Sequence, residues 1–384
     1  PVPTVLQKER LGTADALKAA RPVLETVKRG TILVVFGDTP FIAPQTLAAM
    51  VEAREAGAAV VVLGFKPQDP GAYGRLVVDP SGDLQAIVEY NDADDATRKI
   101  GLCNSGVMAI DAARVFDLVD RIGNDNAKGE YYLTDIVAIA RAQDLSCRVI
   151  LAQEEELRGI NSRSELATAE AQWQARARLA AMDAGVTLLD PQTVYFSWDT
   201  VLGQDVTIGQ NVVFGPNVVV EGDVTIKAFS HMEGCVIRRG AVVGPYARLR
   251  PGADIGEEAR IGNFVEVKNA TFAAGAKANH LSYIGDATVG ERANIGAGTI
   301  TCNYDGYLKH QTVIGAEAFI GSNSALVAPV TIGARATIGA GSTITRTVAP
   351  DALSIARGDQ RDLPGLAAKL RARLKARKEA LKKT

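Results

Sequence analysis

The strongest constraint on the fold is a six-residue repeat of aliphatic and aromatic residues in the second half of the chain. Small residues follow many repeat positions, as in Ile208-Gly209, and small residues suit tight corners. This period is typical of a parallel β-helix, in which three hexapeptides form one triangular coil of about 18 residues. An ordinary sandwich of similarly short strands is the alternative. The sixteen repeat positions are Ile208, Phe214, Val220, Ile226, Ile237, Val243, Leu249, Ile255, Ile261, Val267, Ile314, Ile320, Leu326, Ile332, Ile338 and Ile344.

Two segments interrupt the repeat. Residues 269–283 and 301–311 do not follow the six-residue spacing. In repeat proteins, insertions project from the regular body and often carry function. We therefore expect both segments to be functional loops.

The first 160 residues have a different pattern. Residues 31–36 form a β-branched and aromatic run, which favours a buried strand of a parallel sheet. A helical segment at 46–56 and another buried strand at 58–65 complete a βαβ pattern, which predicts an α/β domain. Further helices are expected at 12–25, 134–143 and 164–182, and further strands at 83–90, 106–110 and 148–152.

Charge and cysteine content exclude some classes of protein. The formal net charge is −2, which gives no reason to expect nucleic acid as the main partner. The basic residues are concentrated in residues 369–384, which carry +7 and leave −9 on the rest. The four cysteines show no CxxC pair, which favours a reducing, cytoplasmic location. No apolar run reaches the roughly 18 residues of a membrane helix.

The second half contains a candidate base and a candidate anion clamp. His280, in the first interruption, has a side chain suited to proton transfer near neutral pH, although a satisfied surface histidine is the alternative. Three scattered histidines make a metal site there improbable. Arg250 and Lys268 are 18 residues apart, so they should stack on adjacent coils. A bridging phosphate would relieve their repulsion. Pairing with Glu266 or Glu257 is the alternative.

The first half contains a candidate metal ligand. Asp38 follows the strand at 31–36, and ligand sites of open α/β sheets lie at the carboxyl ends of strands. A carboxylate there often holds Mg²⁺ that bridges substrate phosphates, although a turn or helix-capping role is the alternative. Gly12-Thr13 opens the first predicted helix, where backbone N–H groups can cradle an anion.

Together these motifs resemble the bacterial bifunctional N-acetylglucosamine-1-phosphate uridylyltransferase / glucosamine-1-phosphate N-acetyltransferase family over essentially the whole chain. In the first half the resemblance rests on Val5–Thr13, Phe36–Pro40, Tyr73–Arg75, Val88-Glu89, Asn104–Gly106, Gly129–Asp135 and Gly159–Arg163. In the second half it rests on Ala247–Gly252, Asn263–Lys268, Asn279–Gly285 and Asn294–Gly306, of which the last is the most diagnostic.

The resemblance implies four segments. These are a partial Rossmann-like uridylyltransferase domain at 1–163, a helical linker at 164–184, a left-handed β-helix acetyltransferase domain at 185–357, and a basic tail at 358–384. It also implies a homotrimer with sites between neighbouring prisms. The cellular role implied is UDP-N-acetylglucosamine synthesis for peptidoglycan and lipopolysaccharide.

For acetyl transfer, the resemblance makes His280 the general base that deprotonates the amine of glucosamine 1-phosphate. It implies further sugar-phosphate contacts from Arg250, Lys268, Tyr283 and Asn294. It places Asn303, Tyr304 and Ser322 around the thioester of acetyl-CoA, where donors stabilise the developing oxyanion. Ala297, Ala340 and Arg357 match coenzyme contacts.

For uridylyl transfer from UTP to N-acetylglucosamine 1-phosphate, the resemblance implies Mg²⁺ on Asp38 and Asn161. The implied substrate contacts are Gln7, Gly12, Thr13, Gly74, Glu89, Asn104 and Asn161. The family's glycine-rich phosphate loop has no match here, and Arg10 stands where the family usually has Gln. We therefore expect acetyl transfer to be complete in this chain and uridylyl transfer to be carried by the full-length protein.

Two other functions remain as alternatives. One is a different sugar-nucleotide pyrophosphorylase with a β-helix domain, although such a protein needs neither His280 nor the Asn303-Tyr304 pair. The other is a trimeric scaffold that binds sugar nucleotides without turnover. The basic tail at 366–384 is either a solvated helix or an element that covers the coenzyme site or contacts an anionic partner.

Overall fold

A computed structural model describes every residue except 1, 127 and 382–384. The chain divides into two compact units, Pro1–Ala169 and Glu170–Thr384. The boundary falls inside the long helix α7 (Arg163–Asp183), which occupies the predicted linker. Among the described residues, no helix is both long enough and apolar enough to cross a membrane.

The first unit is built on a six-stranded mixed sheet with the order β4-β3-β5-β2-β6, to which β1 adds by pairing with β5. Its strands are β1 (Thr31–Val34), β2 (Val60–Phe65), β3 (Arg75–Val78), β4 (Leu84–Val88), β5 (Cys103–Asp111) and β6 (Cys147–Leu151). Its helical segments are α1 (Thr13–Ala19), α2 (Arg21–Leu24), α3 (Pro44–Glu55), α4 (Asp95–Arg98), α5 (Val115–Val119), η1 (Leu133–Asp135), α6 (Ile136–Arg141) and η2 (Glu154–Glu156).

Two predictions for this unit were wrong. The strand at 31–36 is not part of a buried parallel pair, because β1 pairs antiparallel with β5 and Leu33 is 37 % exposed. Both β1 and β2 pair antiparallel with β5. The two strands of the predicted βαβ segment are therefore separated by β5, which lies much later in the sequence. The helix at 12–25 is two short helices that meet at Ala20.

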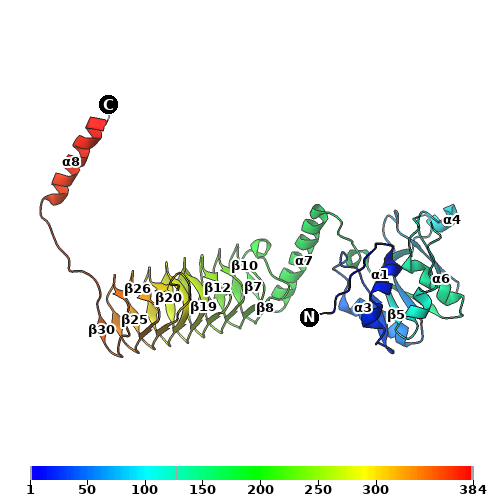
Figure 1. Cartoon of the computed structure of the whole chain (residues 1–384), viewed down its shortest axis with the longest axis horizontal. Coiled ribbons are helices and arrows are strands. Elements are labelled where there is room, and N and C mark those ends of the chain that lie inside the picture. The colour runs from blue at the N-terminus through cyan, green and yellow to red at the C-terminus, as the bar shows by residue number, and fades with distance from the viewer. Residues whose placement is uncertain (1, 127, 382–384) are drawn as a thin grey trace. The chain divides into compact units, whose positions relative to one another are not determined.

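The second unit is a parallel β-helix, so the predicted fold class is confirmed (Figure 1). The first face contains β7 (Thr187–Leu188), β9 (Thr207–Ile208), β12 (Thr225–Ile226), β15 (Val242–Val243), β18 (Arg260–Asn263), β20 (Lys277–His280), β22 (Asn294–Ile295), β25 (Phe319–Ile320), β28 (Thr337–Ile338) and β30 (Leu353–Ser354). The short helix η3 (Pro191–Thr193) precedes the second face.

Two long strands, β19 (Glu266–Phe272) and β21 (Tyr283–Val289), bend at a corner of the prism. Each strand therefore belongs to both the second and the third face. The second face also contains β10 (Val213–Phe214), β13 (His231–Met232), β16 (Arg248–Leu249), β23 (Ile300–Cys302), β26 (Ala325–Val327) and β29 (Thr343–Ile344). The third face also contains β8 (Val201–Leu202), β11 (Val218–Val220), β14 (Cys235–Ile237), β17 (Ala253–Ile255), β24 (Thr312–Ile314) and β27 (Val330–Ile332).

The repeat positions form the core of the prism. Ile208, Ile226 and Ile261, for example, are at most 1 % exposed. Each stacks on the equivalent residue of the next coil, and burying one such side chain contributes roughly 1.5–3 kcal/mol. Because every coil buries its apolar residues against its neighbours, the repeat alone stabilises the stack. The last helix, α8 (Leu366–Leu381), follows an exposed segment.

The two interruptions of the repeat have different structures. Residues 269–283 are not a loop: β18 pairs with β20 and Arg260 lies opposite Lys277, so this coil is only one residue shorter than an 18-residue coil. Residues 303–311 are a true insertion, because Ala287 of one coil lies opposite Thr312 of the next, 25 residues later. We call residues 303–311 the insertion loop.

Candidate active sites

Arg250 and Lys268 lie on adjacent coils, as their spacing predicted. The N–H of Arg250 donates to the carbonyl of Val267, next to Lys268, at 2.9 Å. Nη1 of Arg250 also donates to Oε1 of Glu266 at 2.8 Å, so the carboxylate partner left open by the sequence is present as well. Nε of Arg250 is buried without a hydrogen-bond partner in the described residues. A buried donor beside a second cation suits an anionic ligand.

A third cation, Lys309 of the insertion loop, joins this pair. Lys309 lowers the pKa of the Lys268 ammonium through a hydrogen bond and through charge repulsion, and Arg250 lowers it further. Sequence analysis missed Lys309. Its position in a segment that interrupts the repeat was the available signal. Three converging cations strengthen the case for a phosphate-bearing ligand.

A buried carboxylate, Asp286, organises the residues beside these cations. Asp286 is 6 % exposed and accepts hydrogen bonds from the carboxamides of Asn269, at 2.6 Å, and Asn303. Burial acts to raise the pKa of Asp286, but these two hydrogen bonds and the nearby lysines outweigh it and hold the pKa below its ordinary value. The ionised carboxylate therefore fixes the Asn303 amide and balances part of the positive charge.

The side chains of Tyr283 and Asn303 converge over Gly285. A Cβ atom on Gly285 would lie 2.4 Å from the Tyr283 hydroxyl and 2.9 Å from Nδ2 of Asn303. The N–H of Gly285 donates to the Thr301 hydroxyl at 2.8 Å, which holds the two coils in register. The absence of a side chain at Gly285 is what lets the two polar groups meet.

His280 lies at the end of β20, near the corner that joins the first and second faces. Its Nδ1 is 2.7 Å from Oδ1 of Asn263 on the neighbouring coil. With this oxygen as acceptor, the ring carries its proton on Nδ1, and Nε2 keeps a free lone pair. His280 and Asn263 line a groove of about 550 Å³ together with Lys227 and Arg260. No carboxylate lines this groove in the described residues.

The predicted coenzyme contacts fall on the same corner as His280. The N–H of Gly298 donates to the carbonyl of His280, the N–H of Asn323 to that of Ala297, and the N–H of Gly341 to that of Ser322. Nη1 of Arg357 then donates to the carbonyl of Ala340 at 2.7 Å. Together these bonds align five of the predicted residues in one row, which we call the corner row: His280, Ala297, Ser322, Ala340 and Arg357.

Two predicted residues, Asn294 and Tyr304, belong neither to this row nor to the groups around Lys268 and Gly285. Asn294 sits on β22 of the first face, in register with Lys277 and Phe319. Tyr304 belongs to the insertion loop, where its hydroxyl donates to the carbonyl of Gly306 at 2.5 Å. Tyr304 is 60 % exposed, so its ring is not packed against the body of the prism.

In the first unit, the predicted uridylyltransferase residues line two cavities that share Phe36, Tyr73 and Ser105. The first cavity has a volume of about 720 Å³. It is also lined by Lys128, a cation that sequence analysis did not single out. Lys128 directly precedes the Gly129–Asp135 motif, which was the available signal. Six predicted residues line this cavity: Gln7, Gly12, Thr13, Gly74, Glu89 and Asn104.

The turn at Gly12 depends on glycine. Its φ is +117°, and a Cβ atom there would lie 2.5 Å from the carbonyl oxygen of Tyr131. That oxygen accepts the N–H of Ala14 at 3.0 Å, so this N–H of the first turn is not available to an anion as the sequence suggested. The side chain of Gln7 holds this segment to the helix, because its Nε2 donates a hydrogen bond to the carboxylate of Asp15 at 2.7 Å.

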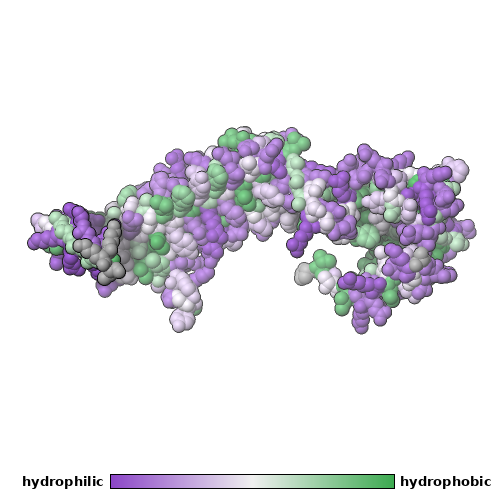
Figure 2. Space-filling view, turned by 90° about the horizontal axis from the view of Figure 1, so that it is seen from above, coloured by the Kyte–Doolittle hydropathy of each residue, from purple (hydrophilic) through white to green (hydrophobic). Residues whose placement is uncertain are grey.

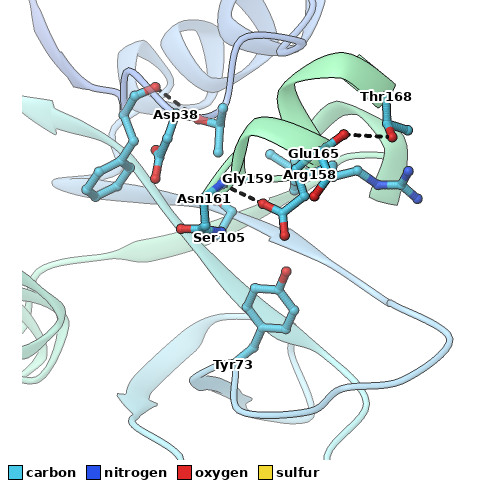
Figure 3. A pocket seen from close by; sticks show the side chains of 12 residues that line it. Asp38, Tyr73, Ser105, Arg158, Gly159, Asn161, Glu165 and Thr168 are labelled. Carbon is cyan, nitrogen blue, oxygen red and sulfur yellow. Dashed lines mark hydrogen bonds between the residues drawn. The ribbon is translucent and has the colours of Figure 1, made fainter. Parts of the chain in front are cut away.

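Asp38 and Asn161 line the second cavity, of about 730 Å³, and Figure 3 shows both side chains facing it with the Tyr73 hydroxyl directed toward it. The N–H of Ile160 donates to the carbonyl of Asp38 at 2.9 Å, which brings the two segments together. The carboxylate and amide oxygens are hard donors of the kind Mg²⁺ prefers, with its remaining positions filled by phosphates and water. The described residues contain no cluster of three or more His, Cys, Asp or Glu that could hold a metal ion.

Two carboxyl groups at or near the cavity lined by Gln7 and Gly12 have raised pKa values. Burial raises the pKa of Glu89, and the charge of Asp92 raises it further. Burial also raises the pKa of Asp135, with Asp92 contributing in the same direction. Glu89 lines the cavity, and a perturbed acid in such a position is typical of a ligand site.

The fold and these sites define a two-domain transferase, with a nucleotidyltransferase sheet domain followed by a hexapeptide acyltransferase prism. Family models agree: the nucleotidyl transferase model matches residues 2–163, and the bacterial transferase hexapeptide model matches residues 234–269 and 311–346.

Curated relatives identify the family. The chain is 59 % identical over 380 residues to the bifunctional protein GlmU of Paramagnetospirillum magneticum, covering 98 % of this chain and 84 % of the relative. It is 60 % identical over 377 residues to GlmU of Rhodospirillum rubrum, again covering 98 % and 84 %. GlmU of Ruegeria sp. is 57 % identical over 376 residues, covering 98 % and 83 %. The chain belongs to the bifunctional GlmU family, so the predicted bifunctional transferase of UDP-N-acetylglucosamine synthesis is confirmed.

Proposed function

We propose that residues 185–357 transfer an acetyl group from acetyl-CoA to the amine of glucosamine 1-phosphate, with His280 as the general base. The observation that carries this proposal is the corner row, which runs from His280 to the coenzyme-side residue Arg357. Nε2 of His280 takes a proton from the substrate ammonium, and the resulting amine attacks the thioester carbonyl. The carbon–sulfur bond then breaks, the attacking nitrogen loses its second proton as the amide forms, and the thiolate of coenzyme A takes up a proton.

The cation cluster of Arg250, Lys268 and Lys309 binds the sugar phosphate in this proposal. The orphan Nε of Arg250 and the lowered pKa of Lys268 both indicate positive charge that lacks a full complement of anions. Tyr283 and Asn294 contact the sugar. Asn303, Tyr304 and Ser322 lie around the thioester, where Asn303, held by Asp286, is oriented before the substrate arrives.

Residues 1–163 carry the uridylyltransferase site in this proposal, with 164–184 as linker and 358–384 as tail. Gln7, Gly12 and Thr13 contact the uridine, while Gly74, Glu89 and Asn104 contact the sugar. Asp38 and Asn161 would hold Mg²⁺, which neutralises phosphate charge when bound. These residues orient the sugar phosphate toward the α-phosphate of UTP, with pyrophosphate as the leaving group.

The acetyltransferase works as a homotrimer in the cytoplasm in this proposal. A second set of corner residues, different from the corner row, supports the assembly. All four have φ between +51° and +58° and are 46–60 % exposed: Phe229, Tyr246, Phe264 and Leu281. Bulky residues rarely adopt this conformation, and the three rings stack at 4.9 and 5.1 Å. Figure 2 shows that hydrophobic side chains reach the surface of the β-helix. A second prism packed on this set would cover them beside His280.

The test is thiol release from acetyl-CoA in the presence of glucosamine 1-phosphate. Release that requires the sugar phosphate and falls by about 10²–10⁴-fold in His280→Ala would support the proposed base. His231→Ala is the matched control, since this histidine lies on β13 and is not in the corner row. A folded trimer that releases no thiol would favour the scaffold alternative.

A further inference from the structure

The C-terminal helix α8 is a basic segment to which the proposed acetyltransferase mechanism assigns no role. Every residue of α8 is exposed, and none of its six cations forms an ion pair with another described residue. Residues 357–365 are exposed as well, so α8 is joined to the last coil by an exposed segment. The six cations of α8 and its leucines Leu366, Leu370 and Leu374 therefore face solvent in the described part of the chain.

The charge pattern of α8 works against an isolated helix. Lys369 and Arg373, Arg371 and Lys375, and Arg373 and Arg377 are all four residues apart. Like charges at this spacing destabilise a helix. With 16 residues, α8 is only just longer than the roughly 12–15 residues below which isolated helices are marginal in water even without such repulsion. A surface that supplies negative charge would remove this cost.

The apolar residues of α8 indicate which kind of negatively charged surface the helix would bind. Leu366, Leu370 and Leu374 recur once per turn on one side of the helix and are 50–52 % exposed. A nucleic-acid backbone would satisfy the cations but not the leucines, and residues 358–384 contain no aromatic side chain for base stacking. A bilayer with anionic headgroups offers both charge and an apolar layer.

We propose that α8 is a peripheral membrane anchor that binds bilayers containing anionic phospholipids. Leu366, Leu370 and Leu374 enter the boundary between headgroups and acyl chains, while the lysines and arginines contact lipid phosphates. The remainder of the chain carries −9, so an anionic bilayer repels it and contact is confined to the tail. This arrangement would hold a sugar-nucleotide-forming enzyme at the membrane surface without a spanning helix.

The test is co-sedimentation of the full chain with vesicles of phosphatidylcholine, with or without phosphatidylglycerol. We expect at least about tenfold stronger binding to the anionic vesicles. The gain should be lost when salt rises from about 0.1 M to about 1 M, which shortens the Debye length from about 10 to about 3 Å. Equal sedimentation with both vesicle types would overturn the proposal.

Two triple variants separate the contributions, and both leave the prism untouched. Leu366→Ser/Leu370→Ser/Leu374→Ser and Lys369→Gln/Arg371→Gln/Arg373→Gln should each lose vesicle binding. Leu353→Ser, which changes a leucine that is 67 % exposed outside α8, should keep it. Full binding by the leucine variant would contradict insertion, and displacement from vesicles by RNA would assign the tail to nucleic acid. Thiol release by the same samples tests the acetyltransferase proposal separately.

Discussion

The carboxamide oxygen of Asn263 lies 2.7 Å from Nδ1 of His280, across two adjacent coils of the β-helix. This contact depends on the shortened coil, because β18 and β20 place Asn263 directly opposite His280. The single hydrogen bond sets the tautomer of the proposed base. It is the kind of supporting contact that orients a catalytic imidazole.

Removing this contact should reduce acetyl transfer without removing the base. We expect Asn263→Ala to lower kcat by about tenfold, which is part of the roughly 10²–10⁴-fold that a positioned base contributes, and to leave the KM for the sugar phosphate nearly unchanged. Asn263→Asp would place a carboxylate against the imidazole ring, and a carboxylate stabilises the imidazolium form. The acid limb of the kcat profile should then move to higher pH. An unshifted profile in Asn263→Asp would argue against a role for Asn263 in positioning.

Adding a methyl group at Gly285 should damage the site more than the fold. In Gly285→Ala the new Cβ would press on the Tyr283 hydroxyl and on Nδ2 of Asn303. Overpacking of this kind costs about 1–3 kcal/mol, so we expect a folded protein with a large loss of kcat. Thermal unfolding and thiol release measure the two effects. Gly358→Ala, where a Cβ would meet nothing within 4 Å, should be neutral in both.

Replacing the carboxylate of Asp286 tests whether it orients Asn303. In Asp286→Asn the negative charge is lost. One of the two donors, the amide of Asn269 or that of Asn303, then faces the new N–H₂ group, which is also a donor, so kcat should fall by about tenfold or more. Asn269→Ala removes only the other partner and should have a smaller effect. Because Asp286 also balances Lys268, the variant should bind the sugar phosphate as well as wild type or more tightly. An unchanged kcat would show that Asn303 needs no such support.

The lowered pKa of Lys268 predicts a pH dependence for sugar-phosphate binding. Lys268 is charged below its folded-state pKa, and Lys309 moves that value down from 10.5. Affinity for the phosphate should therefore begin to fall at a lower alkaline pH than an ordinary lysine would give. Lys309→Ala should shift this loss to higher pH while weakening binding at neutral pH. The KM for glucosamine 1-phosphate measured against pH checks both, and Lys268→Arg should abolish the alkaline loss.

Thiol labelling should distinguish the four cysteines. Burial raises the pKa of Cys235 to about 12 and that of Cys147 to about 11, and Cys103 is also buried with a raised pKa. Cys302 alone is partly exposed. We expect one thiol to react quickly in the native protein and all four in denaturant, with the fast reaction absent in Cys302→Ala. Fast reaction of a second thiol would indicate local opening of a core.

The sequence by itself determined the β-helix and the stacking of Arg250 on Lys268 in the proposed acetyltransferase site. Coils of a β-helix contact only their neighbours at nearly fixed sequence separation, so counting residues places Arg250 beside Lys268. The same counting failed at 269–283, because one missing residue shifts the spacing without breaking the strands. The GlmU motifs indicated the remaining site residues, but not how those residues contact one another.

Only the tertiary structure decided the contacts that join distant segments. The pairing of β1 with β5 connects residues about 80 positions apart, and no local pattern specifies which strand becomes its neighbour. Lys309 reaches Lys268 from the insertion loop, in which Tyr304 and Lys309 form an antiparallel bridge. The bonds of Asp286 to Asn269 and Asn303 form because three consecutive coils bring these polar groups together at one corner. Local periodicity carries no information about such pairings, since they depend on how packed elements meet.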